Sequence, residues 1–203
     1  GGTWLGISEQ GGYALVTNLR GYGAPEPHMA SRGALVSDLL TGTGPHADAA
    51  SVDLTNFNPF NLIVADAHEA QFLTNRPAPI RTSLAPGLYG LSNGALDEPW
   101  PKTMQLKAQL LDWLTGPAED PALLLDGLRS ELLPAIGLPP RAPSDAPQEP
   151  RDSPIFIRNP VYGTRCSSVV MIDREGRGRI IERRYDAHGE ATGTTARHFA
   201  WPT

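Results

Sequence analysis

The sequence predicts an α+β fold in which antiparallel sheets are flanked by helices. Short alternating or apolar segments bounded by glycine and proline occur before residue 92 and again after residue 166, and the strongest amphipathic helix signals lie between them. Most strand segments follow one another without an intervening helix, which disfavours a βαβ repeat. Hydrophobic residues make up 40% of the chain and charged residues 19%, as is typical of a globular protein.

The chain opens with a predicted hairpin and a helix. Residues 3–8 and 13–19 alternate well enough for two strands, and Gly11-Gly12 between them is a turn signal. After a loop rich in glycine and proline, residues 32–40 place leucines and a valine on one helical face. Ser31 is the expected N-cap of this helix.

The next part of the chain alternates weak and strong signals. Residues 46–54 give a weak helix signal, and 60–66 form an apolar run that predicts a buried strand. A turn at Ala67-His68 leads into a strand over 69–75. Segments 80–84 and 88–92 predict two more short strands.

Two helices and a linker come next. Residues 101–114 begin with proline and carry an apolar stripe, which predicts the clearest helix of the chain. A second helix is expected from 120 to 133, with its leucines buried. Residues 139–154 are dominated by proline and predict an exposed linker or long loop.

The C-terminal part predicts a hairpin of strands over 167–173 and 179–185, followed by an edge strand over 198–201. With 203 residues the chain has the length of one good-sized domain. We therefore expect a single domain over residues 1–203.

Composition excludes several classes of function. The formal net charge is -5 and no block of like charge occurs, so we expect no nucleic-acid partner. The most basic stretch, 174–184, is interleaved with glutamates and is better interpreted as the exposed face of a hairpin. No apolar run approaches the ~20 residues that a membrane span needs.

Cysteine and histidine usage bounds the cofactors. Cys166 is the only cysteine, so an internal disulfide is impossible, and a reducing, cytoplasmic location is expected. The 5 histidines show no paired spacing, so we expect neither a metal site nor another cofactor. Cys166 stands at the start of an apolar strand with no histidine nearby, and a buried or half-buried structural role is favoured over a nucleophile.

Seven segments, weak individually, occur together in an order and at a spacing that resemble the NRDE-motif family, also called the transport and Golgi organisation protein 2 family. They are GTWLGI at 2–7, LVTN at 15–18, SRG at 31–33, FNLIVAD at 60–66, GLYGLSN at 87–93, EPWPK at 98–102 and YGTR at 162–165. The resemblance implies an N-terminal-nucleophile hydrolase-like αββα sandwich, with two stacked antiparallel sheets between helical layers.

The start of the chain departs from the family pattern. Members usually begin Met-Cys and continue into an Asn-Arg-Asp-Glu motif, whereas this chain begins at Gly1 and reaches a predicted strand within three residues. We expect a partial, N-terminally truncated member that lacks the first strands and the catalytic nucleophile. Thr3, which trimming would expose, matches an internal position of the family and is a poor substitute.

Three residues are the candidate catalytic residues of the wider hydrolase fold. Asn18 ends the second predicted strand, where its amide could donate to an oxyanion. Asn93 stands beside a turn, where it could orient a substrate or nucleophile, and Arg165 could pair with a carboxylate at the mouth of the site. The alternative for each asparagine is a turn or cap residue bonded to local backbone. For the motif aromatics Trp4 and Trp100, core packing is favoured over ligand stacking.

The resemblance implies a candidate amidohydrolase acting on C–N amide bonds, inactive in this chain because the nucleophile is absent. The alternative is a carrier that uses the same cleft for haem or a lipid-like acyl molecule; the family resemblance includes an association with haem mobilisation. An interaction module, suggested only by the proline-rich linker, ranks last. The expected partner is therefore a small-molecule ligand or an amide substrate.

Overall fold

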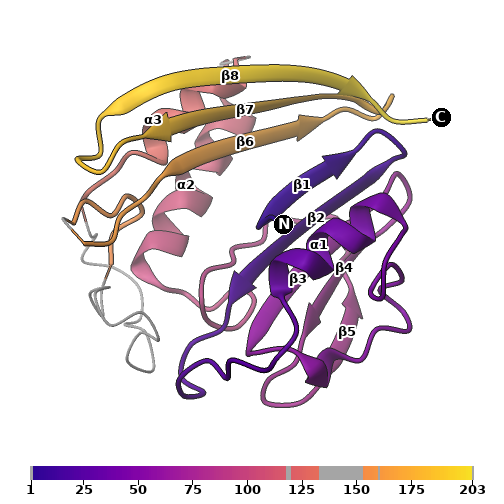
Figure 1. The fold of residues 1–203 in the computed structure, drawn as a ribbon. Coiled ribbons are helices and arrows are strands. Elements are labelled where there is room, and N and C mark those ends of the chain that lie inside the picture. Colours follow the sequence, from indigo (N-terminus) through magenta and orange to yellow (C-terminus); the bar gives the residue numbers. More distant parts are fainter. Residues whose placement is uncertain (1, 118–119, 133–152, 160, 203) are drawn as a thin grey trace. The chain divides into compact units, whose positions relative to one another are not determined.

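The computed structural model describes residues 2–117, 120–132, 153–159 and 161–202. The chain forms two compact units, which we describe separately (Figure 1): Gly1–Gly87 with Ala200–Thr203, and Leu88–Phe199. The proline-rich loop expected over 139–154 lies outside the described residues, except for its last two positions.

The first unit contains a five-stranded antiparallel sheet whose strands follow one another in chain order. Its strands are β1 (Leu5–Ser8), β2 (Gly12–Asn18), β3 (Phe60–Ala65), β4 (Ala70–Thr74) and β5 (Ile80–Ser83). Each predicted strand of this region is confirmed to within two residues. Gly11 closes the first hairpin with φ 100°, a conformation that glycine adopts without a steric penalty.

Helix α1 (Arg32–Thr41) lies against one face of this sheet. Its predicted N-cap is confirmed, because the Ser31 hydroxyl accepts a hydrogen bond from the Ala34 amide at 3.2 Å. The core of the unit consists of apolar side chains from α1, β2, β3, β4 and the segment before β3. Its buried members are Ala14, Val16, Leu35, Val36, Val52, Leu54, Phe57, Phe60, Leu62 and Leu73.

The helix expected over 46–54 is wrong. The segment consists of turns and a single 3-10 turn, η1 (Leu54–Asn56). The carboxylates of Asp48 and Asp53 accept hydrogen bonds from the amides of Ala50 and Thr55, both at 2.9 Å. Such local side-chain bonds compete with helical hydrogen bonding and stabilise turns instead.

Asn75, directly after β4, is fully buried and ties three backbone segments together. Its amide nitrogen donates to the carbonyls of Leu54 at 3.1 Å and Phe57 at 2.9 Å, and its oxygen accepts from the Phe60 amide at 3.0 Å. The side chain therefore satisfies buried backbone groups that no strand partner reaches.

The second unit combines helices with a three-stranded sheet of order β6-β7-β8. Its elements are α2 (Pro101–Thr115), η2 (Pro121–Leu123), α3 (Leu124–Gly127), β6 (Cys166–Ile172), β7 (Arg177–Tyr185) and β8 (Ala191–Ala200), of which the last residue belongs to the first unit. Leu125 packs with Val169 and Ile181 to join α3 to the sheet. The predicted helix at 101–114 and the predicted hairpin are confirmed.

The helix expected over 120–133 is too long, because α3 ends at Gly127. Gly127 faces the Gln109 side chain of α2, whose Oε1 would lie 2.3 Å from a Cβ built at this glycine. The chain then turns, and the Ser130 carbonyl accepts from the Phe156 amide at 2.9 Å. Leu123, expected to be buried, is 53% exposed.

Two strand predictions also need correction. Residues 88–92 form no strand and run as an irregular segment. The last strand, expected over 198–201, is the much longer β8, ten residues with mostly exposed side chains. An exposed edge strand needs no apolar face, so the hydrophobic alternation that normally signals a strand is missing here.

Candidate functional site

A cavity of about 330 Å³ lies in the second unit where the irregular segment 89–92 meets the start of α2. We call it the lysine cavity. It is lined by Tyr89, Gly90, Leu91, Ser92, Lys102, Thr103, Leu106, Lys107, Leu110, Leu128 and Ile155. Two of the segments that carried the family resemblance, 87–93 and 98–102, therefore contribute to one site.

Close backbone approach shapes this cavity. A Cβ on Gly90 would stand 2.2 Å from Cγ2 of Thr103 and 2.9 Å from Cδ of Lys107, so only glycine allows the segment to approach α2 this closely. Gly90 and Asp97 are also joined twice: the Gly90 amide donates to the Asp97 carboxylate at 2.6 Å, and the Asp97 amide donates to the Gly90 carbonyl at 2.8 Å.

Asp97 fixes one of the two lysines. Its carboxylate accepts from Nζ of Lys107 at 2.9 Å while it also holds the Gly90 amide. Burial acts to raise the pKa of Asp97, but the hydrogen bonds from Lys107 and Gly90 outweigh it and hold this pKa below its ordinary value. Asp97 is thus ionised at neutral pH, and the charge of Lys107 is partly balanced.

Lys102 and Thr103 occupy the first turn of α2, where the helix dipole favours negative charge. The Trp100 side chain at the N-cap does not accept a hydrogen bond from the helix. Lys102 donates to the Ser153 hydroxyl at 3.0 Å. Thr103 is 5% exposed, and its Oγ1 has no hydrogen-bond partner among the described residues.

A second cavity, of about 510 Å³, lies between α2, α3 and β6, and we call it the leucine cavity. Its lining is mostly apolar and consists of Leu106, Gln109, Leu110, Trp113, Leu123, Leu124, Gly127, Leu128, Ser168, Val169 and Val170. Leu106, Leu110 and Leu128 line both cavities. The two cavities therefore share a wall of three leucines, which we call the leucine wall.

The first unit has a cavity of its own, of about 370 Å³, between α1, the loop 47–50 and the hairpin of β3 and β4. Burial raises the pKa of Tyr13, which lines it, to about 12. Asp48 and Asp66 also line it, and both carboxylates accept hydrogen bonds from nearby backbone amides. These acidic groups therefore have a structural explanation in the turns that they stabilise.

The three sequence-predicted catalytic residues lie in different places. Asn18 is the last residue of β2 in the first unit, opposite Phe60, and its Oδ1 is buried. Asn93 is half-buried in the second unit and follows Ser92, which lines the lysine cavity. Arg165 is exposed directly before β6, and its guanidinium donates to the Asp186 carbonyl at 2.8 Å, a backbone group rather than a carboxylate.

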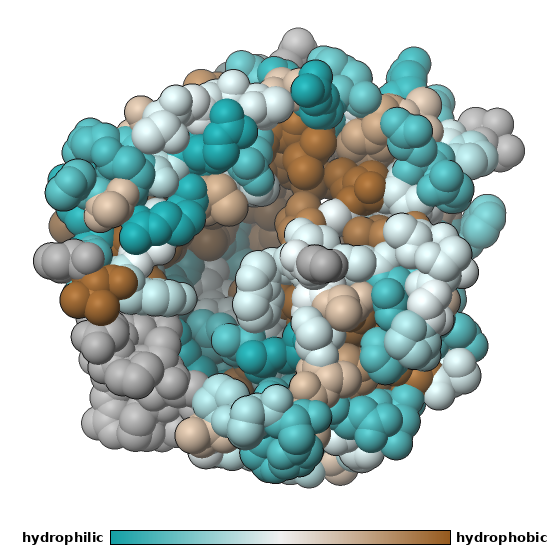
Figure 2. All heavy atoms as spheres, in the orientation of Figure 1, coloured by the Kyte–Doolittle hydropathy of each residue, from teal (hydrophilic) through white to brown (hydrophobic). Residues whose placement is uncertain are grey.

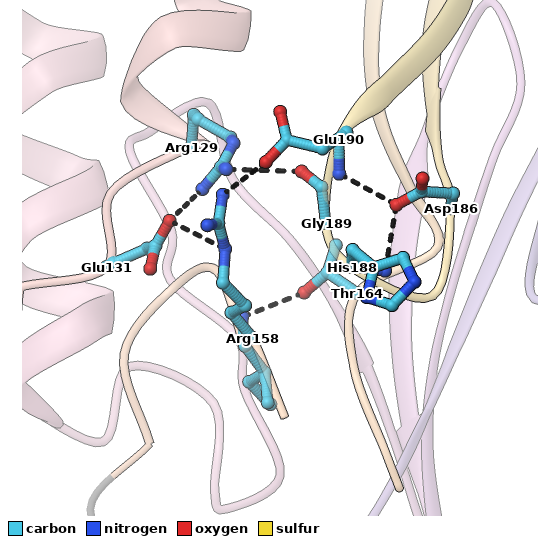
Figure 3. A network of polar contacts seen from close by, with 9 residues as sticks. Arg129, Glu131, Arg158, Thr164, Asp186, His188, Gly189 and Glu190 are labelled. Carbon is cyan, nitrogen blue, oxygen red and sulfur yellow. Dashed lines mark hydrogen bonds and ion pairs between the residues drawn. The ribbon is translucent and has the colours of Figure 1, made fainter. Parts of the chain in front are cut away.

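Thr164, within the motif segment 162–165, belongs to a polar network in the second unit (Figure 3). In this network Arg129 donates to the Gly189 carbonyl at 3.1 Å, forms an ion pair with Glu131 and stacks 3.8 Å from the centroid of the Phe156 ring. Arg158 pairs with Glu131 at 3.4 Å and with Glu190 at 3.2 Å. Each arginine side chain thus contacts a carboxylate, and the network holds the β7–β8 turn to the segments before β6.

The remaining singled-out residues give mixed outcomes. Cys166 starts β6 as expected, but its side chain is exposed rather than buried. Trp100 is 3% exposed and packs as predicted, whereas Trp4 is 54% exposed and lies near the Arg32 guanidinium, 5.9 Å from the ring centroid. Core packing is therefore wrong for Trp4.

Sequence reasoning did not single out Lys102, Thr103 and Lys107 as site residues. Two signals were available: Lys102 lies in the EPWPK segment, and all three stand in the first two turns of a helix that begins with proline. The sequence pattern did not show which segment packs against these three residues, since only the fold brings Gly90 against Thr103.

Three further observations concern membrane spans, metal ligands and the surface. Among the described residues no helix is long and apolar enough to cross a membrane, and no group of three or more His, Cys, Asp or Glu side chains is placed to hold a metal ion. Hydrophilic residues cover much of the face seen in Figure 2, where hydrophobic residues form smaller groups among them.

Antiparallel sheets, covering helices and two adjoining cavities define an α+β protein with a site of small-molecule size. The profile of the family described as Transport and Golgi organisation 2 matches residues 1–187, and the chain belongs to this family. It is 33% identical to the human Transport and Golgi organization protein 2 homolog and 32% identical to the mouse Transport and Golgi organization 2 homolog, in each case over 90% of this chain and 72% of the relative. Identity to the Drosophila melanogaster Transport and Golgi organization protein 2 is 26%, over 94% of this chain and 75% of the relative. The family resemblance inferred from seven short segments is thereby confirmed.

Proposed function

We propose that this chain binds and carries an amphipathic small molecule with an anionic head and an acyl-like apolar tail. The observation that carries the proposal is the leucine wall shared by a cavity containing two lysines and a cavity lined mainly by leucine and valine. The head would lie near Lys102 and Lys107, and the tail would pass Leu110 into the leucine cavity.

The sizes support a ligand of this class. Pockets for small molecules typically measure about 300–1,000 Å³ and are largely apolar with a few polar groups that fix orientation. The lysine and leucine cavities, at about 330 and 510 Å³, fall in this range. Burial of an alkyl chain contributes about 0.8 kcal/mol per methylene group, so the leucine cavity would supply most of the affinity.

An acyl anion fits these cavities better than haem does. Haem iron is held in proteins by His, Cys, Met or Tyr, and among the described residues that line the two cavities Tyr89 is the single one of these types. An absorbance titration with haem tests the difference. Non-stoichiometric binding supports the acyl ligand, and saturable one-to-one binding abolished by Tyr89→Phe would favour haem.

The carrier proposal is tested by isothermal titration calorimetry with dodecanoate. Leu110→Trp fills the shared wall, while Leu111→Trp places the same side chain at a position that is 49% exposed and lines neither cavity. We expect one binding site, at least a tenfold loss of affinity for Leu110→Trp, and no change for Leu111→Trp. Equal affinity of the two variants would contradict the proposal.

The second candidate function is amide hydrolysis on an N-terminal-nucleophile hydrolase-like fold, favoured by the family membership. In this reading Asn18 donates to the oxyanion, Asn93 orients the substrate and Arg165 pairs with a substrate carboxylate. Cys166 is a poor nucleophile, because partial desolvation of its sulfur and the nearby Glu182 raise the pKa of the thiol and disfavour the reactive thiolate.

Hydrolysis is tested with N-acyl amide substrates, with product release followed by chromatography. We expect this chain to give no turnover, and an acyl amide to bind without being cleaved. Reproducible turnover abolished by Asn18→Ala but retained in Cys166→Ser would establish catalysis within this chain and demote the carrier function.

A further inference from the structure

The two cavities follow each other along one face of α2. Thr103 lines the lysine cavity only, whereas Leu106 and Leu110 line both cavities. Trp113 lines the leucine cavity only, and none of the described residues after it in α2 lines either one. Because these positions are three or four residues apart, they share a face of the helix. A ligand with its head at the lysine cavity would therefore extend along α2 toward Trp113.

The opposite wall of the cavities has the same order. Leu128, the C-cap of α3, lines both cavities, whereas Leu123 of η2 and Leu124 at the start of α3 line only the leucine cavity. The segment from η2 to α3 thus approaches the lysine cavity at its C-terminal end. Trp113 and Leu123 accordingly mark the end of the leucine cavity that lies away from the lysines.

The Trp113 indole joins the two walls at that end. Its Nε1 donates to the carbonyl of Asp120, directly before η2, at 3.3 Å. The Asp120 carboxylate accepts from the Ala122 amide at 3.0 Å and from the Arg179 guanidinium of β7 at 3.3 Å. The position of the indole is therefore fixed through α2, η2 and β7, which suits a residue that limits the length of the cavity.

We propose that Trp113 limits the length of the acyl tail, and that the ligand is a medium-chain acyl anion whose tail ends against the indole. This inference rests on the proposed carrier function and adds a chain-length limit to it. The ten residues from Thr103 to Trp113 correspond to about 15 Å along the helix axis. An extended chain of single bonds advances by about 1.2 Å per bond, so a tail the length of dodecanoate spans this distance.

The affinity gained by each methylene group should end at the same point. A methylene group that is covered by apolar side chains gains roughly fourfold in affinity. Beyond Trp113, α2 continues only to Thr115, which is exposed. Methylene groups that pass the indole would therefore remain in water and add little.

Calorimetry with octanoate, dodecanoate and hexadecanoate, each below its micelle concentration, tests the limit on the whole chain. Wild type should bind dodecanoate at least about tenfold more tightly than octanoate, but hexadecanoate no more than about twofold more tightly than dodecanoate. Trp113→Leu removes the end wall, so this variant should bind hexadecanoate at least about tenfold more tightly than dodecanoate. Its affinity for octanoate, which is too short to reach the indole, should equal that of wild type.

Leu114→Ala is the matched control. Leu114 is the next residue of the same helix, is 59% exposed and lines neither cavity. This variant should keep the chain-length preference of wild type. Circular dichroism confirms that each variant is folded.

A second measurement uses the wild-type chain alone. Among the described residues that line the two cavities, Trp113 is the single tryptophan. Bromine quenches tryptophan fluorescence only at close range, so dodecanoate brominated at its last carbon should quench more strongly than dodecanoate brominated beside the carboxylate. Equal quenching by the two ligands would overturn the placement of the tail end at Trp113.

The outcomes separate the two proposals. If none of the three acyl anions binds, the carrier function itself is wrong and the chain-length limit falls with it. If they bind but wild type gains as much from dodecanoate to hexadecanoate as from octanoate to dodecanoate, the carrier function stands and the limit is overturned. An unchanged preference in Trp113→Leu also overturns the role of Trp113.

Discussion

The second unit contains two polar clusters that differ in how completely their groups are satisfied. In the network of Figure 3, the two arginines contact carboxylates, and Arg129 also contacts a carbonyl and an aromatic ring. In the lysine cavity, the Thr103 hydroxyl is buried and has no hydrogen-bond partner among the described residues. The first cluster has the properties of a structural brace, whereas the second has those of a binding site. Mutations should therefore affect stability in one cluster and ligand affinity in the other.

The largest expected effect is on the brace. Arg129→Ala removes the stacking on Phe156, the ion pair with Glu131 and the bond to Gly189, and should lower the free energy of unfolding by roughly 2–3 kcal/mol. Urea denaturation measures it. Arg177→Ala, at a side chain that is 72% exposed and pairs only at the surface, is the matched control and should leave the urea midpoint almost unchanged. An equal loss in both variants would remove the distinction between brace and surface pair.

Gly90→Ala should affect both properties. The added methyl group would press on Thr103 and Lys107, and we expect a loss of roughly 1–2 kcal/mol in stability together with weaker dodecanoate binding. Gly12→Ala is the control, since its Cβ would meet neighbours at 3.6 Å or more. Calorimetric affinity and the urea midpoint are measured on the same samples. Undiminished binding by Gly90→Ala would show that this wall of the cavity does not contact the ligand.

The hydrogen bonds that the Asp97 carboxylate accepts from Gly90 and Lys107 predict that stability depends on pH. The pKa of Asp97 is lowered in the folded state, so its contribution is fully present above the unfolded pKa of about 3.9 and is lost as pH falls through the folded value. We expect wild type to exceed Asp97→Asn by about 1 kcal/mol at neutral pH, and the difference to vanish in acid. Urea midpoints across pH 2 to 7 would provide the check. A constant difference over this range would exclude the ionised carboxylate as its cause.

The smallest effect is expected at Arg165, an exposed residue that donates to the backbone of Asp186 in the brace. Arg165→Ala loses a bond to the Asp186 carbonyl and should cost about 0.5–1 kcal/mol, with no change in the affinity for dodecanoate. Arg165→Lys should recover part of the stability. A loss of ligand affinity without loss of stability would support the role in substrate binding that the sequence suggested.

Regular elements with a buried face could be predicted from sequence. Exposed elements, and features that depend on contacts between distant parts of the chain, could not. Strand 60–66 was found because a buried strand must be apolar, and α1 because Ser31 and the leucine spacing mark its start and face. The full extent of β8 was missed because its side chains are mostly exposed. The early end of α3 at Gly127 was missed because leucines continue beyond it at helical spacing, at positions 128, 132 and 133.

The residues of the candidate site likewise include some that could be predicted from sequence and some that could not. Two motif segments, 87–93 and 98–102, contribute residues to the lysine cavity, and Asn93 follows Ser92, which lines it. Sequence patterns did not group the two lysines with Thr103. Only the folded chain brings Gly90 against Thr103 and leaves the Thr103 hydroxyl without a partner among the described residues. No periodicity encodes either property.

Asn75 sets a limit on how the first unit can vary in sequence. Its side chain donates twice and accepts once in a fully buried place, between the carbonyls of Leu54 and Phe57 and the amide of Phe60. Aspartate would set a negative charge against two carbonyl oxygens, and glutamine would need room for another methylene group. Among proteins that diverge from this chain, the surrounding leucines and phenylalanines can exchange for one another, whereas position 75 should drift very little.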